Sequence, residues 1–131
     1  MSRRQNYEIP GISHSMPIPM AARVGNAFHT SAIMGKDPAT NTLPEDGERQ
    51  VEFVFSNARA LLDVAEVELD QVVYVEVLLA DNDLRTDVNK YWVQWYPDEA
   101  DRPARHTTLR ELPGGMKIQL KVQAQLDLSH E

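Results

Sequence analysis

The C-terminal quarter of the chain contains a strictly alternating segment that constrains the fold more than any other feature. Over residues 116–126 every odd-numbered position is Lys or Gln, whereas the even-numbered positions are apolar: Met116, Ile118, Leu120, Val122, Ala124 and Leu126. Successive side chains of a β-strand point to opposite faces of the sheet. The segment therefore predicts a strand with one face in a core and the other face polar.

A second candidate strand comes directly before this one. Residues 104–112 are rich in Thr and Leu, and the sequence LPGG between the two runs has the composition of a turn. Two strands joined by a short glycine-containing turn favour a hairpin. In such a hairpin Arg105 lies near the start of the first strand and shares the polar face with residues near Gln119. The pattern predicts a cationic spot lined by amides.

The N-terminal part of the chain predicts a pair of strands after an irregular start. Residues 1–19 contain Pro10, Pro17 and Pro19, so we expect an irregular lead-in. Residues 20–24 and 27–34 are candidate strands joined by a Gly-Asn turn at positions 25 and 26. Residues 36–44 are expected to form a loop.

The middle of the chain predicts two helices that flank a strand. Glu45, Asp46 and Glu48 follow Pro44, and negative charge suits the positive end of a helix dipole. Apolar residues then recur at spacings of three and four up to Ala65, which indicates one buried helix face. Residues 69–80 are the most hydrophobic run and predict a central strand covered on both faces. A second helix is expected over residues 84–96, where Tyr and Trp residues would anchor the core or form one wall of a ligand site.

This order of elements predicts an α+β fold, in which two helices pack on one face of a mixed β-sheet. We expect the other face of the sheet to carry apolar side chains as well. An exposed apolar face of that size is unfavourable in water, which is a physical reason to expect an oligomer.

Composition excludes several classes of function. The chain has 131 residues, no cysteine and a net charge of -7, which fits a single domain over residues 1–131 without disulfides or Cys-based metal sites. No dense Lys and Arg cluster is present, so nucleic acid is not an expected partner. No apolar run spans a bilayer and the N-terminus lacks the apolar core of a signal peptide, so we expect no membrane association and a cytoplasmic location.

Several segments together resemble the Rid (reactive intermediate deaminase, YjgF/L-PSP) family, of which this chain looks like a divergent member. The similar segments are PAR followed by a Leu-Pro turn and an alternating terminal strand, RVGNAFHTSAI, DPATNTLP and VNKYW. The resemblance implies the chorismate-mutase-like Rid fold, assembled as a homotrimer around a central barrel. It also implies inter-subunit clefts that hydrolyse small carboxylate-bearing imines or enamines to ketones and ammonia, without a cofactor.

The resemblance assigns roles to individual residues. Arg105 matches the family arginine that binds the carboxylate of the substrate, and a guanidinium can hold a carboxylate through two parallel hydrogen bonds. The alternative for Arg105 is a structural ion pair with one of the twenty acidic residues. Asn89 and Ser31 match family residues near the site. Thr107 lies two residues after Arg105 in a strand, so it points the same way and adds a hydroxyl.

Three positions depart from the family pattern. Gln119 stands where active deaminases carry a glutamate that positions the attacking water, and an amide cannot accept a proton from water. Ile18 replaces a tyrosine, so a hydroxyl is missing from the cleft. Ala32 replaces a glycine and adds a methyl group.

These departures leave two functions open. In the first, Arg105 fixes the carboxylate while Gln119 and backbone carbonyls hold the water that hydrolyses an electrophilic imine. In the second, the cleft is a non-catalytic binding module for small acidic or aromatic-acid metabolites.

The remaining motifs do not indicate a metal site or a nucleotide cofactor. His29 would lie two residues before Ser31 on a strand and could supply a base, although a lone His is more often a packed or surface residue. The histidines have no spacing typical of a metal site, so we expect no metal. The two glycines at positions 114 and 115 form a turn rather than a phosphate loop, so no nucleotide cofactor is expected.

Overall fold

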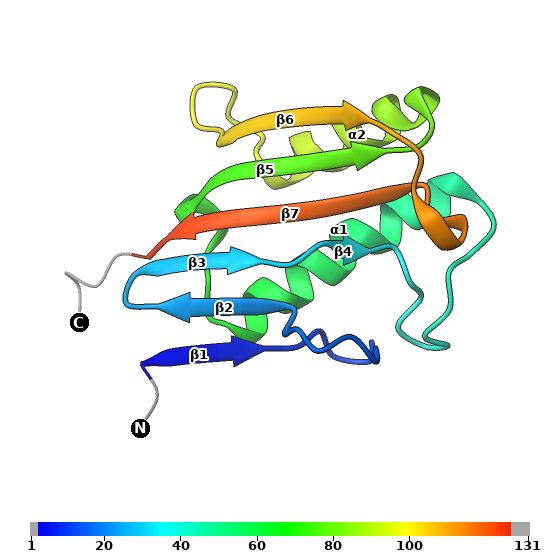
Figure 1. Ribbon diagram of the computed structural model, residues 1–131. Coiled ribbons are helices and arrows are strands. Elements are labelled where there is room, and N and C mark those ends of the chain that lie inside the picture. Colours follow the sequence, from blue (N-terminus) through cyan, green and yellow to red (C-terminus); the bar gives the residue numbers. More distant parts are fainter. Residues whose placement is uncertain (1–2, 127–131) are drawn as a thin grey trace.

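The computed structural model describes residues 3–126, which form a seven-stranded sheet with two α-helices behind it (Figure 1). The strands follow the spatial order β1-β2-β3-β7-β5-β6, and β4 also pairs with β7. Their bounds are β1 Arg4–Tyr7, β2 Ala21–Val24, β3 Ala27–Thr30, β4 Ile33–Met34, β5 Val72–Leu79, β6 Ala104–Leu109 and β7 Ile118–Gln125. The predicted α+β class, with a mixed sheet and two helices on one face, is confirmed.

The two helices lie where the hydrophobic periodicity predicts them. Helix α1 is Gly47–Val64 and α2 is Arg85–Trp95, and three short 3-10 helices connect the elements: η1 Leu69–Gln71, η2 Asn82–Leu84 and η3 Pro113–Gly115. Asp46 caps α1, because its side chain accepts a hydrogen bond from the backbone N–H of Glu48. Trp92 and Tyr96 are buried against the sheet as core anchors.

The predicted hairpin between residues 104–112 and 116–126 is wrong. Strand β5 lies between the two strands, paired in parallel with β6 and antiparallel with β7. The parallel pair arises because α2 connects β5 to β6, and a helical crossover returns the chain to the same end of the sheet. The turn containing Gly114 and Gly115 carries the chain past β5, with φ angles of 67° and 81° that favour glycine.

The N-terminal predictions also need correction. The first nineteen residues are not wholly irregular, because β1 pairs antiparallel with β2 and forms one edge of the sheet. The predicted strand 27–34 is broken at positions 31 and 32 into β3 and β4. The hydroxyl of Thr30 accepts a hydrogen bond of 2.9 Å from the backbone N–H of Val122, so a side chain meets β7 near the break.

Buried amides fasten α1 to the neighbouring loops. The Nε2 of Gln50 donates to the carbonyls of Pro44 and Gly115 at 2.8 and 3.1 Å, and its Oε1 accepts from the backbone of Lys117 at 2.8 Å. Asn57 donates to the carbonyls of Met34 and Lys36. Both side chains are almost fully buried, and their hydrogen bonds offset the cost of removing amides from water.

The face of the sheet away from the helices is mainly polar. It carries Gln119, Lys121, Gln123 and Gln125 of β7, and Lys121 forms an ion pair of 3.6 Å with Glu76 of β5. The expectation of an apolar second face is therefore wrong, apart from Leu78, which is buried outside the helix-side core. The prediction that β5 is covered on both faces is also wrong for the single chain, since Val73 is 54% exposed.

Candidate functional site

Arg105 lies on the edge strand β6 and points toward α2. Its register partner on β5 is Val75, a fully buried residue of the helix-side face, which sets the direction of the side chain. The guanidinium carbon lies 4.9 Å from the centre of the Trp92 ring, and Nη2 donates a 2.7 Å hydrogen bond to Oδ1 of Asn89. Asn89 and Trp92 are three residues apart on α2, so they share one helix face. Together they fix the plane of the guanidinium.

The guanidinium of Arg105 is partly unsatisfied. Its Nη1 is buried and has no hydrogen-bond partner among the described residues. Burial, and then the nearby positive charge of Arg85, lowers the pKa of Arg105 below its ordinary value. Within residues 3–126 no carboxylate forms an ion pair with Arg105, so the alternative of a structural ion pair has no partner in that part of the chain. An arginine fixed on one side and unpaired on the other can receive a carboxylate.

Thr107 lies beside Arg105 on the same face of β6. Its register partner is the buried Val77, whereas His106 pairs with Glu76 and points to the polar face. The Thr107 side chain is half-buried. Arg105 contacts Asn89 at the β6 edge, and Thr107 lies on the same face of β6 as Arg105.

Gln119 is not part of this group. It pairs with Leu78 of β5 and with Met34 of β4, so its side chain lies on the polar face of the sheet. Its Nε2 contacts Sδ of Met116 at 3.4 Å. The predicted shared face of Arg105 and Gln119 is wrong, because the strand β5 separates them and their side chains point to opposite sides.

Ile18 and Ser31 lie toward the opposite edge of the sheet. Ile18 belongs to the loop between β1 and β2 and is 47% exposed. Ser31 follows β3, where its Oγ donates a 2.8 Å hydrogen bond to the carbonyl of Pro19. Ile18 and Pro19 line a hollow of about 550 Å³ together with Asn6, Glu8, Ile12, Ser13, His14, Met16 and Pro17.

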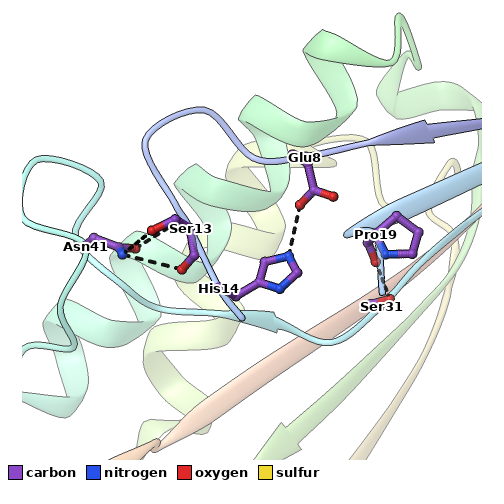
Figure 2. A network of polar contacts seen from close by, with 6 residues as sticks. All are labelled: Glu8, Ser13, His14, Pro19, Ser31 and Asn41. Atoms are coloured by element: carbon purple, nitrogen blue, oxygen red, sulfur yellow. Dashed lines mark hydrogen bonds and ion pairs between the residues drawn. The ribbon is translucent and has the colours of Figure 1, made fainter. Parts of the chain in front are cut away.

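The loop that forms this hollow is held by specific contacts (Figure 2). Asn41 donates to Oγ of Ser13 at 2.8 Å and accepts from the Ser13 backbone at 3.1 Å. His14 Nε2 lies 3.0 Å from a carboxylate oxygen of Glu8, and the His14 side chain is only 16% exposed. Neither Glu8 nor His14 is predicted from the sequence as a site residue, because the proline-rich segment has no periodicity that would show its folding.

A second hollow, of about 450 Å³, lies at the end of α2. Its lining includes Trp95, Tyr96 and Val73, but none of the predicted site residues. Three carboxylates, from Asp70, Asp98 and Asp101, also line it against the single cation of Arg102, and this negative balance opposes the binding of an acidic ligand. The candidate site therefore comprises the surroundings of Arg105 and the Ile18 hollow.

Other candidate chemistry is limited. His29 pairs with Gln123 on the polar face, it is exposed, and the strand breaks before Ser31. Residues 3–126 contain no group of three His, Cys, Asp or Glu side chains arranged to hold a metal ion. In the same range neither helix combines the length and the apolarity that crossing a membrane requires.

Comparison with known proteins identifies the family of the chain. The family model described as Endoribonuclease L-PSP matches residues 16–126. A RutC family protein of Aquifex aeolicus is 27% identical over 109 residues, which cover 82% of this chain and 87% of that protein.

Solved structures share the fold. RidA from an Antarctic Psychrobacter bacterium superposes with a TM-score of 0.83 at 27% identity, covering 93% of this chain and 99% of that one. The YjgF gene product of E. coli superposes with a TM-score of 0.79 at 21% identity, covering 92% of this chain and 98% of that one. The chain therefore belongs to the Rid (YjgF/L-PSP) family.

Proposed function

We propose that this protein hydrolyses a small carboxylate-bearing imine or enamine at clefts between subunits of a homotrimer. The observation that carries the proposal is the guanidinium of Arg105, which is held by Asn89 and Trp92 and has a buried, unpartnered Nη1. A fixed guanidinium that has no carboxylate of its own suits the carboxylate of a substrate. Thr107 supplies a hydroxyl on the same face of β6.

The position of the predicted residues supports a site built from two subunits. Asn89, Arg105 and Thr107 lie at the β6 edge, whereas Ile18 lies in the loop beside the β1 edge. One chain cannot bring these groups together, because the width of the sheet separates them. A head-to-tail contact between the β6 edge of one subunit and the β1 edge of the next joins both groups and closes a ring. In a three-membered ring the polar faces of the sheets line a central barrel.

Imine hydrolysis needs modest help from the protein, because a protonated imine is already electrophilic. Arg105 fixes the carboxylate, and positioning of the reactants supplies on the order of 7 kcal/mol in favourable cases. Gln119 can orient a water molecule through its amide but cannot take a proton from it. Ile18 makes its side of the cleft apolar, which favours substrates with apolar side chains.

A binding module for small acidic or aromatic acids is the second candidate. It is favoured by Gln119, whose amide contacts the sulfur of Met116 at 3.4 Å instead of presenting a carboxylate. In that case Arg105 still binds the ligand, but no turnover follows.

The charge of the chain argues against nucleic acid as a partner. The family model carries a ribonuclease description, yet the net charge of -7 and the absence of a dense basic cluster in the sequence oppose binding to a phosphate backbone. We propose a cytoplasmic location for the trimer.

The test uses 2-imino acids generated in situ by an amino acid oxidase, with the free imine trapped by semicarbazide. The wild type should reduce the trapped imine, whereas Arg105→Ala should not. A wild type that leaves every imine unchanged but binds 2-oxo acids through Arg105 would favour the binding module. Light scattering should give the mass of three 14.8 kDa chains, and a monomer would contradict the inter-subunit site.

A further inference from the structure

The hollow beside Ile18 contains the carboxylate of Glu8, which lies before the residues 16–126 that the family model matches. Glu8 directly follows β1 and lines this hollow together with Ile18, and its side chain is 55% exposed. Its backbone neighbours are fixed on both sides. The Tyr7 carbonyl accepts a hydrogen bond of 3.0 Å from the backbone N–H of Met20, and Ile9 is only 3% exposed in the core. The carboxylate is therefore held at a defined place although it lies in a loop.

His14 orients this carboxylate. The distance from His14 Nε2 to Oε1 of Glu8 is 3.0 Å (Figure 2). An ionised carboxylate can only accept hydrogen bonds, so Nε2 carries the hydrogen and donates it. The other ring nitrogen, Nδ1, is buried without a partner among the described residues. Among residues 3–126 the second oxygen of Glu8 has no hydrogen bond or ion pair, so it is open to a ligand.

The loop that carries His14 is itself braced. Asn41 exchanges hydrogen bonds with Ser13, the residue before His14. Gly11 adopts a φ of 82° where its backbone packs on Pro38, and a Cβ at this position would come within 2.9 Å of the Pro38 carbonyl. The hydrogen-bonded pair of Glu8 and His14 is thus built on a loop that two separate contacts hold against the β4–α1 connection.

We infer that Glu8 is the catalytic carboxylate of this protein, with His14 as the positioning residue. This role rests on the proposed imine hydrolysis. Glu8 supplies the carboxylate that neither Gln119 nor Ile18 provides. Glu8 lies at the β1 edge, the same edge that the ring brings next to Arg105 of the neighbouring subunit. A carboxylate there also attracts the positively charged nitrogen of a protonated imine.

The chemical step balances with water as the only co-reactant. Glu8 takes a proton from water as the water oxygen bonds to the imine carbon, and the π electron pair of the C=N bond moves to nitrogen. The protonated Glu8 then gives this proton to the amine nitrogen of the carbinolamine. The C–N bond breaks, ammonia leaves, and the hydroxyl proton passes to Glu8 as the C=O bond forms. Glu8 then gives this proton to the departing ammonia, which restores the carboxylate. The net reaction converts the protonated imine and water to ketone and ammonium.

The test compares Glu8→Gln with wild type in the semicarbazide assay. The amide cannot accept a proton, so kcat should fall about 100-fold or more, whereas KM should rise far less, through the lost attraction to the imine nitrogen alone. Glu45→Gln removes an equal charge from an exposed position before α1 and should leave kcat unchanged.

The role of His14 is tested in the same assay. His14→Ala should lower kcat without changing KM, and His14→Gln, which keeps an N–H donor, should recover part of that loss. If Glu8→Gln does not assemble, Glu8→Asp keeps the charge that faces His14 and moves it by one methylene, so it should fold and lose kcat.

The outcomes separate the two ideas. An active wild type with an equally active Glu8→Gln variant overturns the role of Glu8 and leaves the proposed function intact. An inactive wild type overturns both.

Discussion

Asn89 of α2 and Arg105 of β6 are joined by a hydrogen bond of 2.7 Å between Oδ1 and Nη2, sixteen residues apart in the chain. The bond crosses from the helix layer to the edge strand, so the direction of the guanidinium depends on how α2 packs on the sheet. The ring of Trp92 packs against the same guanidinium. Arg105 is thereby fixed by two side chains that are not themselves charged, which leaves its positive charge for a ligand.

The first prediction concerns the hydrogen bond from Arg105 to Asn89. Asn89→Ala frees one side of the guanidinium, and we expect the affinity for a 2-oxo acid, a product analogue, to fall about tenfold, since Arg105 is then less well preorganised for the carboxylate. Titration calorimetry measures the Kd. Because Asn89 is exposed, the free energy of unfolding should change by less than about 0.5 kcal/mol.

The control for this prediction is Gln94→Ala, another exposed residue of α2. It should leave the affinity unchanged. An Asn89→Ala variant with wild-type affinity would show that Trp92 alone is sufficient to orient Arg105.

The second prediction concerns the carboxylate that is missing from β7. Gln119→Glu places an ionisable group at the position of the family glutamate, and we expect kcat for imine hydrolysis to rise, by about tenfold if general base catalysis limits the rate. Gln119 is half-buried on the polar face of the sheet, so this face can accept the charge. Gln123→Glu, four residues along the same face, is the matched control and should leave kcat unchanged. An unchanged kcat in Gln119→Glu would point to Ile18 and the shape of the cleft as the limit.

The alternation of β7 shows what the sequence can and cannot predict. Ile118, Leu120 and Val122 are fully buried and the residues between them face the polar side, as the pattern indicates. The pattern does not say which strand lies next to β7, and nearness in sequence suggested β6. The expected helix over residues 84–96, between two strand-like runs, was the better signal, because a helix between strands favours a parallel pair. Parallel pairing places β5 between β6 and β7.

Some residues of the candidate site can be predicted from the sequence, and others cannot. Arg105, Thr107 and Asn89 gather at one edge because α2 and β6 are regular elements whose side-chain directions follow from periodicity. Glu8 and His14 lie in an irregular loop, where contacts depend on how the chain packs rather than on spacing. Only a folded structure brings these two residues together.

The third prediction concerns the close approach of Gly35 to α1. A Cβ at this position would overlap the backbone carbonyl of Gln50, and neither backbone can move without disturbing the core. Gln50 also binds the carbonyls of Pro44 and Gly115. We expect Gly35→Ala to lower the free energy of unfolding by about 3 kcal/mol or more. Urea denaturation measures this change.

The control for Gly35 is Gly25→Ala, at a turn where a Cβ meets nothing within 4 Å. The φ of 60° at Gly25 costs about 1–2 kcal/mol for alanine. Gly35→Ala should therefore be the more damaging change, and an equal or smaller loss would show that β4 can shift away from α1.

The fourth prediction concerns alkaline pH. The hydroxyl of Tyr96 donates to the Leu69 carbonyl at 3.0 Å, and burial raises the pKa of Tyr96 above its ordinary value of 10.0. The unfolded chain therefore loses this proton at a lower pH than the folded chain. The contribution of Tyr96 is complete below about pH 10 and is lost as the pH rises through the higher folded pKa.

Comparing Tyr96→Phe with the wild type at neutral and at alkaline pH measures the hydrogen bond and the ionisation of Tyr96 separately. At pH 7 the variant should lose about 1 kcal/mol of unfolding free energy, because the hydroxyl and its hydrogen bond are gone while the ring remains. Between about pH 9 and 11 the wild type should lose stability more steeply than the variant, since only the wild type has the shifted group. Urea denaturation at pH 7, 9 and 11 measures both effects. Parallel pH curves for the two proteins would mean that Tyr96 ionises as easily in the folded chain as in the unfolded one, contrary to its burial beside Leu69.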